Sequence, residues 1–149
     1  MIAITLPDGS VKQFDAGITP MEVAISISEG FARNVISASF NDTTIESSTP
    51  LTEDGNLILY TWRDTKGKQA FWHSSAHIMA QALEEMFPGI KLTIGPAIEN
   101  GFYYDIDLVN NTISEKDLKP IEDKMLEIAR GKHVFTLRES SKADALEYY

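Results

Sequence analysis

Two of the three histidines in this sequence, His73 and His77, stand four residues apart in the segment HSSAH. An apolar pattern follows and ends at Pro88-Gly89, which predicts a helix. Residues four apart lie on one face of a helix, so both imidazoles would point the same way. Because imidazole titrates near neutral pH, such a pair can hold and activate water in general acid–base catalysis. His73 and His77 are therefore the candidate catalytic residues.

The position of the pair on its helix leaves a second interpretation open. At about 100° per residue, the core-facing stripe of this helix consists of Trp72, Ser75, Ala76, Met79, Ala82, Leu83 and Met86. Both histidines fall outside that stripe at its edge, with Ala80 between them and Glu84. Such a boundary position suits the wall of a cleft, and it also suits two surface histidines without chemistry.

A metal site is the third interpretation, and the composition counts against it. Zinc needs more than two protein ligands, and the chain contains no cysteine. Further ligands would have to come from His133 or from carboxylates. The metalloprotease pattern H-E-x-x-H is absent, since Ser74 occupies the position of its glutamate. We therefore predict no metal bound by this chain, and a structural role for His133.

Downstream of this helix, the segment IKLTIGPAIENGFYYDIDL predicts a β-hairpin. It alternates in polarity around Asn100-Gly101, a dipeptide typical of two-residue hairpin turns with positive φ. Pro96 interrupts the first arm, which we expect to be bent or at an edge. The alternation places Phe102 and Tyr104 on one face, and Tyr103 and Asp105 on the other.

The remainder of the second half predicts two helices and a strand. One helix begins near Ser114 with a local cap in SEKD, buries Leu118, Ile121, Met125 and Ile128, and ends at Gly131. The segment HVFTLRE predicts a strand, and SSKADALEYY opens another helix. No stop signal follows that helix, so we expect the chain to be part of a longer protein.

The first half predicts a different kind of domain. IAITL and VKQF read as a hairpin around the turn PDGS, and Thr19 can cap a helix with Pro20 at its first position and Glu22 at its third. That helix would end at Gly30, and VISASFNDTTIES predicts two strands joined by an Asn-Asp turn before a closing strand. The order suggests a β-grasp arrangement over residues 1–62, followed by a linker at 63–69 and a second α+β domain at 70–149. Nothing in the first domain suggests catalysis.

Charge and composition exclude several classes of protein. Residues 1–62 have a net charge of −6 and residues 63–149 a net charge of −3, which add up to the −9 of the chain. Neither half has the positive charge of an autonomous nucleic-acid binder. No apolar run is long enough to span a membrane, and the N-terminus has no signal-peptide pattern. We expect a cytoplasmic protein.

Two segments together carry a family resemblance. HSSAHIMAQALEEMFP followed by IGPAIENGFYYDID closely resembles the start of the editing domain of threonyl-tRNA synthetases, and the first half resembles the TGS domain that precedes it in that family. The TGS part is weakly specific, because such domains also occur in GTPases and alarmone enzymes. The combination is highly specific.

The resemblance implies a reaction and roles for particular residues. The family joins threonine to tRNA with ATP and hydrolyses mischarged seryl-tRNA(Thr) at a second site. It implies that His73 and His77 position and activate the water, and that Tyr104 and the backbone around Gly95 form the wall of the substrate pocket. The family's C-x-x-x-H half-site is missing, as are its synthetase core with ATP, magnesium and zinc and its anticodon-binding domain.

The resemblance leads to further expectations, and one alternative stays open. We expect the isolated chain to be inactive, to need no cofactor of its own, and to meet the acceptor end of tRNA(Thr) as part of a homodimeric enzyme held together by other domains. The alternative is a TGS-type regulatory module of a GTPase or stringent-response protein, with a second half that is not catalytic.

Overall fold

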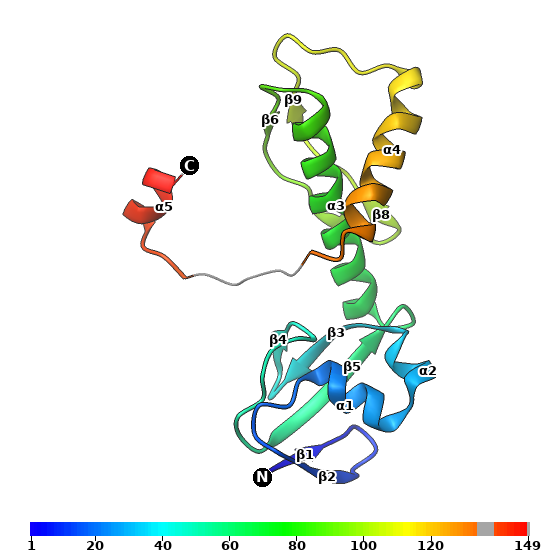
Figure 1. Cartoon of the computed structure of the whole chain (residues 1–149), viewed down its shortest axis with the longest axis vertical. Coiled ribbons are helices and arrows are strands. Elements are labelled where there is room, and N and C mark those ends of the chain that lie inside the picture. The colour runs from blue at the N-terminus through cyan, green and yellow to red at the C-terminus, as the bar shows by residue number, and fades with distance from the viewer. Residues whose placement is uncertain (134–138, 149) are drawn as a thin grey trace.

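The computed structural model describes residues 1–133 and 139–148 and places a five-stranded sheet at the N-terminal end (Figure 1). The spatial order is β2-β1-β5-β3-β4, in which β1 and β5 run parallel and all other neighbours run antiparallel. These strands are β1 (Ile2–Thr5), β2 (Val11–Phe14), β3 (Val35–Phe40), β4 (Thr43–Ile45) and β5 (Gly55–Thr61). A mixed sheet with a helix between β2 and β3 confirms the β-grasp prediction.

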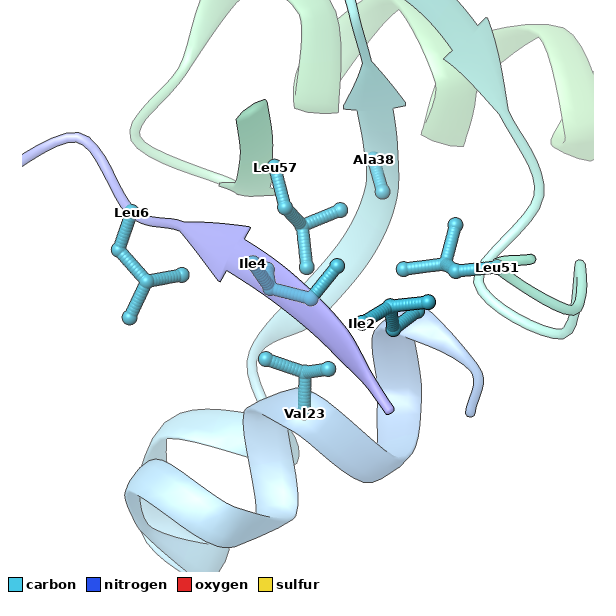
Figure 2. Packing of buried hydrophobic residues seen from close by; sticks show 7 residues of the cluster. All are labelled: Ile2, Ile4, Leu6, Val23, Ala38, Leu51 and Leu57. Carbon is cyan, nitrogen blue, oxygen red and sulfur yellow. The ribbon is translucent and has the colours of Figure 1, made fainter. Parts of the chain in front are cut away.

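The core of this half lies between the sheet and α1 (Pro20–Ile27), as Figure 2 shows. Val23 of α1 packs against the strand residues, and Leu51 closes the core from the loop before β5. Ile4, Val23 and Leu57 are completely buried. The alternation in IAITL places Ile2 and Ile4 on the same side of β1, which explains why a short strand can supply two core residues.

Helix α1 begins as the sequence predicts and ends earlier. The hydroxyl of Thr19 accepts a hydrogen bond from the backbone N–H of Glu22, whose carboxylate accepts one from the N–H of Thr19. The predicted end at Gly30 is wrong, because the extended backbone of Ser28 stops α1 at Ile27. The hydroxyl of Ser28 then caps a second short helix, α2 (Glu29–Ala32). Ile27, the last residue of α1, is 42% exposed.

The cap of α1 makes the stability of the chain depend on pH. Hydrogen bonds from the backbone N–H and the hydroxyl of Thr19 hold the pKa of Glu22 below its ordinary value of 4.5. A lowered pKa stabilises the fold fully above the unfolded value and ceases to do so as the pH falls through the folded value. We expect Glu22→Gln to lower the free energy of unfolding at neutral pH. In this variant the free energy of unfolding should also decrease less steeply as the pH falls, which urea unfolding across the pH range would measure. Glu53→Gln, at an exposed residue without a hydrogen bond in the described part of the chain, should retain that decline; equal pH profiles of the two variants would contradict the cap's role.

The Asn-Asp turn between β3 and β4 is confirmed. Asn41 and Asp42 have φ values of 47° and 65°, and Phe40 pairs with Thr43 on either side of them. Two consecutive residues with positive φ form the hairpin turn that matches the right-handed twist of strands. Asparagine and aspartate tolerate this conformation better than other residues with side chains.

A single long helix, α3 (Thr65–Met86), starts inside the predicted linker. Residues 65–69 are therefore helical, while the division of the chain into domains stays a prediction. The carboxylate of Asp64 accepts hydrogen bonds from the N–H (2.7 Å) and the hydroxyl (2.9 Å) of Thr61, which tightens the turn after β5. Gly67 is buried against the backbone of Thr61, and a Cβ there would collide with its carbonyl oxygen. The polar composition of residues 63–69 therefore reflects a tight joint, that is, the turn that connects β5 to α3.

At the far end of α3, helix α4 (Glu115–Arg130) packs alongside it (Figure 1). Leu83, Ile90 and Ile121 form the buried cluster between them, and the predicted Ser114 cap is present, with Asp117 as its partner. Leu118, which the apolar pattern predicts to be buried, is 60% exposed, whereas Ile121 and Ile128 of the same helix are buried.

An ion pair joins the two helices beside this cluster. Lys124 Nζ lies 2.8 Å from a carboxylate oxygen of Glu85. Hydrogen bonds from Lys124 and Gln81, together with the charges of Lys124 and His133, lower the pKa of Glu85.

The last described segments complete the fold. Four strands of two residues each lie between α3 and α4, namely β6 (Lys91–Leu92), β7 (Ala97–Ile98), β8 (Gly101–Phe102) and β9 (Ile106–Asp107). The predicted helix near the C-terminus is present as α5 (Lys142–Tyr148), capped by Ser141. The predicted strand at 133–139 falls mostly outside the described residues. Within the described ranges, no helix is long and apolar enough to cross a bilayer.

Candidate functional site

The two histidines of the candidate site meet on α3, as their spacing predicts. His73 Nε2 and His77 Nε2 are 3.1 Å apart, and the rings stand edge to face with centroids 4.6 Å apart. Both side chains are exposed, and Ala80, which the sequence places outside the core stripe, is buried beside them. The pair therefore lies at the margin of the core with both imidazoles accessible to a ligand.

The contact between the rings limits how they are protonated. A hydrogen bond between two Nε2 atoms needs one N–H donor and one lone pair, so at most one of these atoms carries a proton. The accepting ring is then a neutral imidazole with its proton on Nδ1, and the lone pair of its Nε2 becomes available to a third group only when the two rings separate. At 3.1 Å no water fits between the two atoms, so a water held by both must part the rings, which exposed side chains can do by rotation.

A third metal ligand beside the histidine pair is missing from the described part of the chain. Across the described residues, no group of three or more histidine, aspartate or glutamate side chains comes together to hold a metal. His133, the predicted source of a further ligand, lies beside Gly131 after α4, and its charge acts on Glu85. The zinc interpretation therefore lacks the ligands it would need among the residues that the structure describes.

The hairpin that carries the other two candidate residues is built from β6 to β9. Leu92 pairs with Ile106, Ile98 pairs with Gly101, and the arms are irregular in between. Pro96 lies in that irregular part, as predicted. Backbone hydrogen bonds between Asp105 and residues 93–94 keep the two arms together there.

The turn of this hairpin lies one residue earlier than predicted. Because Ile98 pairs with Gly101, the two-residue loop consists of Glu99 and Asn100, and neither has positive φ. Gly101 is the first residue of β8 and has φ 141°, a value that favours glycine. The glycine therefore lies next to the turn and not within it.

Gly95 and Tyr104, the two predicted substrate-binding residues, pack directly against each other. A Cβ added at Gly95 would collide with the ring of Tyr104. Tyr104 and Phe102 are half-buried, while Tyr103 and Asp105 are exposed, which confirms the predicted alternation. The missing side chain at Gly95 thus makes room for the aromatic ring, and the pair forms one rigid element of the hairpin.

The hairpin is anchored to α3 immediately before the histidines. Strands β7 and β8 pack against α3, and the ring of Phe102 lies 6.3 Å from that of Trp72. Trp72 precedes His73 in the helix, so the anchoring contact and the histidine pair share the same turn. No hydrogen bond or ring contact links His73 or His77 to Gly95 or Tyr104 in the part of the chain that the structure describes.

Sequence reasoning missed an aromatic cluster around Trp72. Trp62 and Phe71 have ring centroids 5.0 Å apart, and both lie within 5.5 Å of Trp72. Trp62 is 45% exposed and Phe71 is 42% exposed. The sequence carries a signal for it, because the only two tryptophans of the chain flank the predicted linker.

A shallow hollow of about 510 Å³ beside β2 and α1, lined by Phe14 and Ile18 among others, contains none of the predicted site residues.

The packing of Gly95 against Tyr104 leads to a testable expectation. Gly95→Ala should displace the Tyr104 ring and destabilise the chain by about 1–3 kcal/mol, the usual cost of overpacking. Thermal unfolding would measure the loss, and the NMR signals of the Tyr104 ring would report its new environment. Gly89→Ala is a control for a glycine with no atoms near its Cβ position, where only a positive φ opposes the change. An undisturbed Tyr104 ring in Gly95→Ala would contradict the proposed contact.

Both halves of the chain are similar in sequence to known proteins. The sequence model of the TGS domain family matches residues 2–61. All 149 residues align with threonine–tRNA ligases, with 70% identity to that of Flavobacterium johnsoniae, 65% to that of Flavobacterium psychrophilum and 51% to that of Cytophaga hutchinsonii. The chain spans 23% of the length of each of these relatives. A likeness that extends through the second half disfavours a TGS module attached to an unrelated protein.

Proposed function

We infer that this chain, which contains a TGS domain and corresponds along its whole length to the N-terminal region of threonine–tRNA ligases, supplies the histidine side of a hydrolytic editing site. The observation that carries the proposal is the exposed pair His73–His77 on α3, directly after Trp72, where the Gly95–Tyr104 hairpin is anchored. The relatives are aminoacyl-tRNA synthetases by name, and the partner of the site is tRNA charged with the wrong amino acid.

The need for such a site follows from the size of the amino acids. Serine lacks only one methyl group of threonine, and a pocket gains roughly 1–3 kcal/mol of discrimination from one such group. A synthetase that accepts threonine therefore also charges some serine. A second site that hydrolyses seryl-tRNA removes the error, provided that it excludes the larger threonine.

The chemistry proposed for the pair is the hydrolysis of an ester. One imidazole accepts a proton as water attacks the seryl carbonyl carbon, and the bond between that carbon and the ribose oxygen breaks. The ribose oxygen takes up a proton, which leaves free serine and uncharged tRNA. The hydrogen bond between the rings supports this, because its acceptor is a neutral imidazole whose Nε2 can take the proton once a bound water has parted the rings. Gly95 and Tyr104 form the wall that limits the size of the amino acid.

Other parts of the longer protein would carry the ligase reaction with ATP and magnesium, the zinc of the synthetase core and the contacts of a homodimer. Among the described residues the histidine pair has too few ligands for that zinc, and no step proposed for it uses a metal. A cytoplasmic location goes with this proposal, because charged tRNA is consumed there.

The test is the selectivity of hydrolysis by the full-length protein. Purified full-length protein is incubated with seryl-tRNA(Thr) and with threonyl-tRNA(Thr), and the intact ester is measured over time. We expect rapid loss of the seryl ester and survival of the threonyl ester, while the 149-residue chain alone has little activity. Loss of both esters no faster than in buffer would contradict the proposal.

A further inference from the structure

Helix α3 differs from the rest of the chain in its charge. The chain carries a net charge of −9, yet no aspartate or glutamate occurs between Asp64 and Glu84. Within that interval α3 carries Lys66, Lys68 and both histidines of the candidate site. About five helical turns without a carboxylate, in a chain this acidic, form a surface that does not repel an anion.

One cation of this helix is in line with the candidate site. At about 100° per residue, His73 and His77 each lie within about 20° of Lys66 around α3, and His73 follows Lys66 by about 10 Å along the axis. None of the three side chains is buried, and both histidines are exposed. Glu84 lies on the same face beyond His77, so the face is cationic on the N-terminal side of the histidines and acidic on the other. The charge of this face therefore changes from positive to negative along the axis of α3.

The cations at this end of α3 are not neutralised within the described part of the chain. The described residues form ion pairs to Arg33, Lys119 and Lys124, and none to Arg63, Lys66 or Lys68. The carboxylate of Asp64, between them in sequence, accepts two hydrogen bonds from Thr61 through one oxygen and forms no ion pair with these cations. The three positive charges are therefore accessible to a partner.

These cations are interleaved with aromatic rings. Lys66 Nζ lies 5.3 Å from the centre of the Tyr60 ring, and Lys68 Nζ lies 6.0 Å from that of Trp62. Trp62 and Phe71 are each more than two-fifths exposed. Cations that follow a phosphate backbone beside rings on which bases stack are typical of surfaces that bind single-stranded nucleic acid.

We propose that Arg63, Lys66 and Lys68, with Trp62 and Phe71, form an RNA-binding surface around the start of α3, and that Lys66 continues this surface along one face of the helix to the histidine pair. The strand approaches from the N-terminal end of α3 and ends at His73 and His77, because the face becomes acidic at Glu84. This inference rests on the proposed function, since it supplies the path by which the charged 3′ end of an RNA reaches the site. Because the net charge of the whole chain is negative, it gives no sign of this local cationic surface.

The experiment measures how binding of one RNA depends on salt. The probe is a fluorescent RNA hairpin with the acceptor-stem sequence of a threonine tRNA and its single-stranded 3′ end, bound to the 149-residue chain and followed by anisotropy. The variant Arg63→Gln/Lys66→Gln/Lys68→Gln should bind more weakly. Its slope of log K against log salt should decrease in magnitude by about 2, because each cation that neutralises a phosphate of a single strand contributes roughly 0.7 to that slope.

The matched control is Lys116→Gln/Lys132→Gln/Lys142→Gln, which removes the same charge from exposed lysines elsewhere in the chain. This variant should leave the slope unchanged. Two results would overturn the proposed surface, namely equal losses in the two triple variants and failure of the unaltered chain to bind the hairpin.

The variant His73→Ala separates this inference from the proposed function, because it should retain the salt slope. If hydrolysis by the full-length protein survives His73→Ala while the triple variant still loses its slope, the RNA surface stands and the editing role falls.

Discussion

His73→Ala in the full-length protein is expected to slow the hydrolysis of seryl-tRNA(Thr) by about 10²–10⁴-fold, the usual contribution of a general acid–base group. Threonylation should persist, because no residue of the pair is assigned to that reaction. Seryl-tRNA should therefore accumulate when serine and ATP are supplied. The ester remaining after a fixed time, measured with labelled serine, gives the rate.

The geometry of the pair predicts the effect of its second member. Because the two Nε2 atoms share one hydrogen bond, removal of either ring deprives the other of its partner. His77→Ala should be similarly damaging, and the double variant should be little worse than either single one, as is usual for groups that act as a unit. The matched control is His133→Ala, which removes the third histidine of the 149-residue sequence. Normal hydrolysis by His73→Ala, or an equal defect in His133→Ala, would refute the catalytic assignment.

Gly67→Ala is expected to have the largest effect on the structure of the chain. The added Cβ would collide with the carbonyl oxygen of Thr61, and backbone cannot rotate away as a side chain can. The gain in helix propensity from glycine to alanine, about 1 kcal/mol, is smaller than the cost of moving α3 off β5, which we place at about 3 kcal/mol. The difference between these values gives a destabilisation of about 2 kcal/mol, unless the first turn of α3 separates from the sheet instead.

Tryptophan fluorescence distinguishes these two outcomes. Trp62 and Trp72, the only tryptophans of the chain, both lie in the aromatic cluster at this joint, so separation of α3 from β5 should shift their emission. Gly30→Ala is the matched control, since it adds a Cβ to a helical glycine whose nearest neighbour would be 3.6 Å away. Stability and emission in Gly67→Ala equal to those of the unaltered chain would show that the joint is not tight.

The features that could be predicted from the sequence are those decided by neighbouring residues. The cap at Thr19 and Glu22 and the turn at Asn41-Asp42 each depend on a few consecutive side chains, and the structure has both as predicted. The approach of His73 to His77 depends only on helical spacing. The contact between Gly95 and Tyr104 needed the hairpin as well, and the family resemblance, not the pattern, drew attention to those residues.

The errors occur where distant residues decide the outcome. The segment 63–69 looks like a linker in composition, yet the hydrogen bonds of Asp64 and the burial of Gly67 against β5 draw it into a helix. Leu118 continues the apolar stripe of α4 in sequence, but the interface with α3 does not extend to it. Periodicity shows which face of an element is apolar, and it does not show how far along that face the neighbouring element reaches.

The most direct test of the account follows the imidazole signals of His73, His77 and His133 in the full-length protein by NMR while a substrate analogue is added. The analogue joins serine to the 3′ position of adenosine through an amide, which the site cannot readily hydrolyse. If His73 and His77 contact the seryl end of the substrate, their imidazole signals should shift together as the analogue is added, while that of His133 stays in place. A shift confined to His133, or no shift of His73 and His77 at any concentration of the analogue, would contradict the claim that this pair is the editing site.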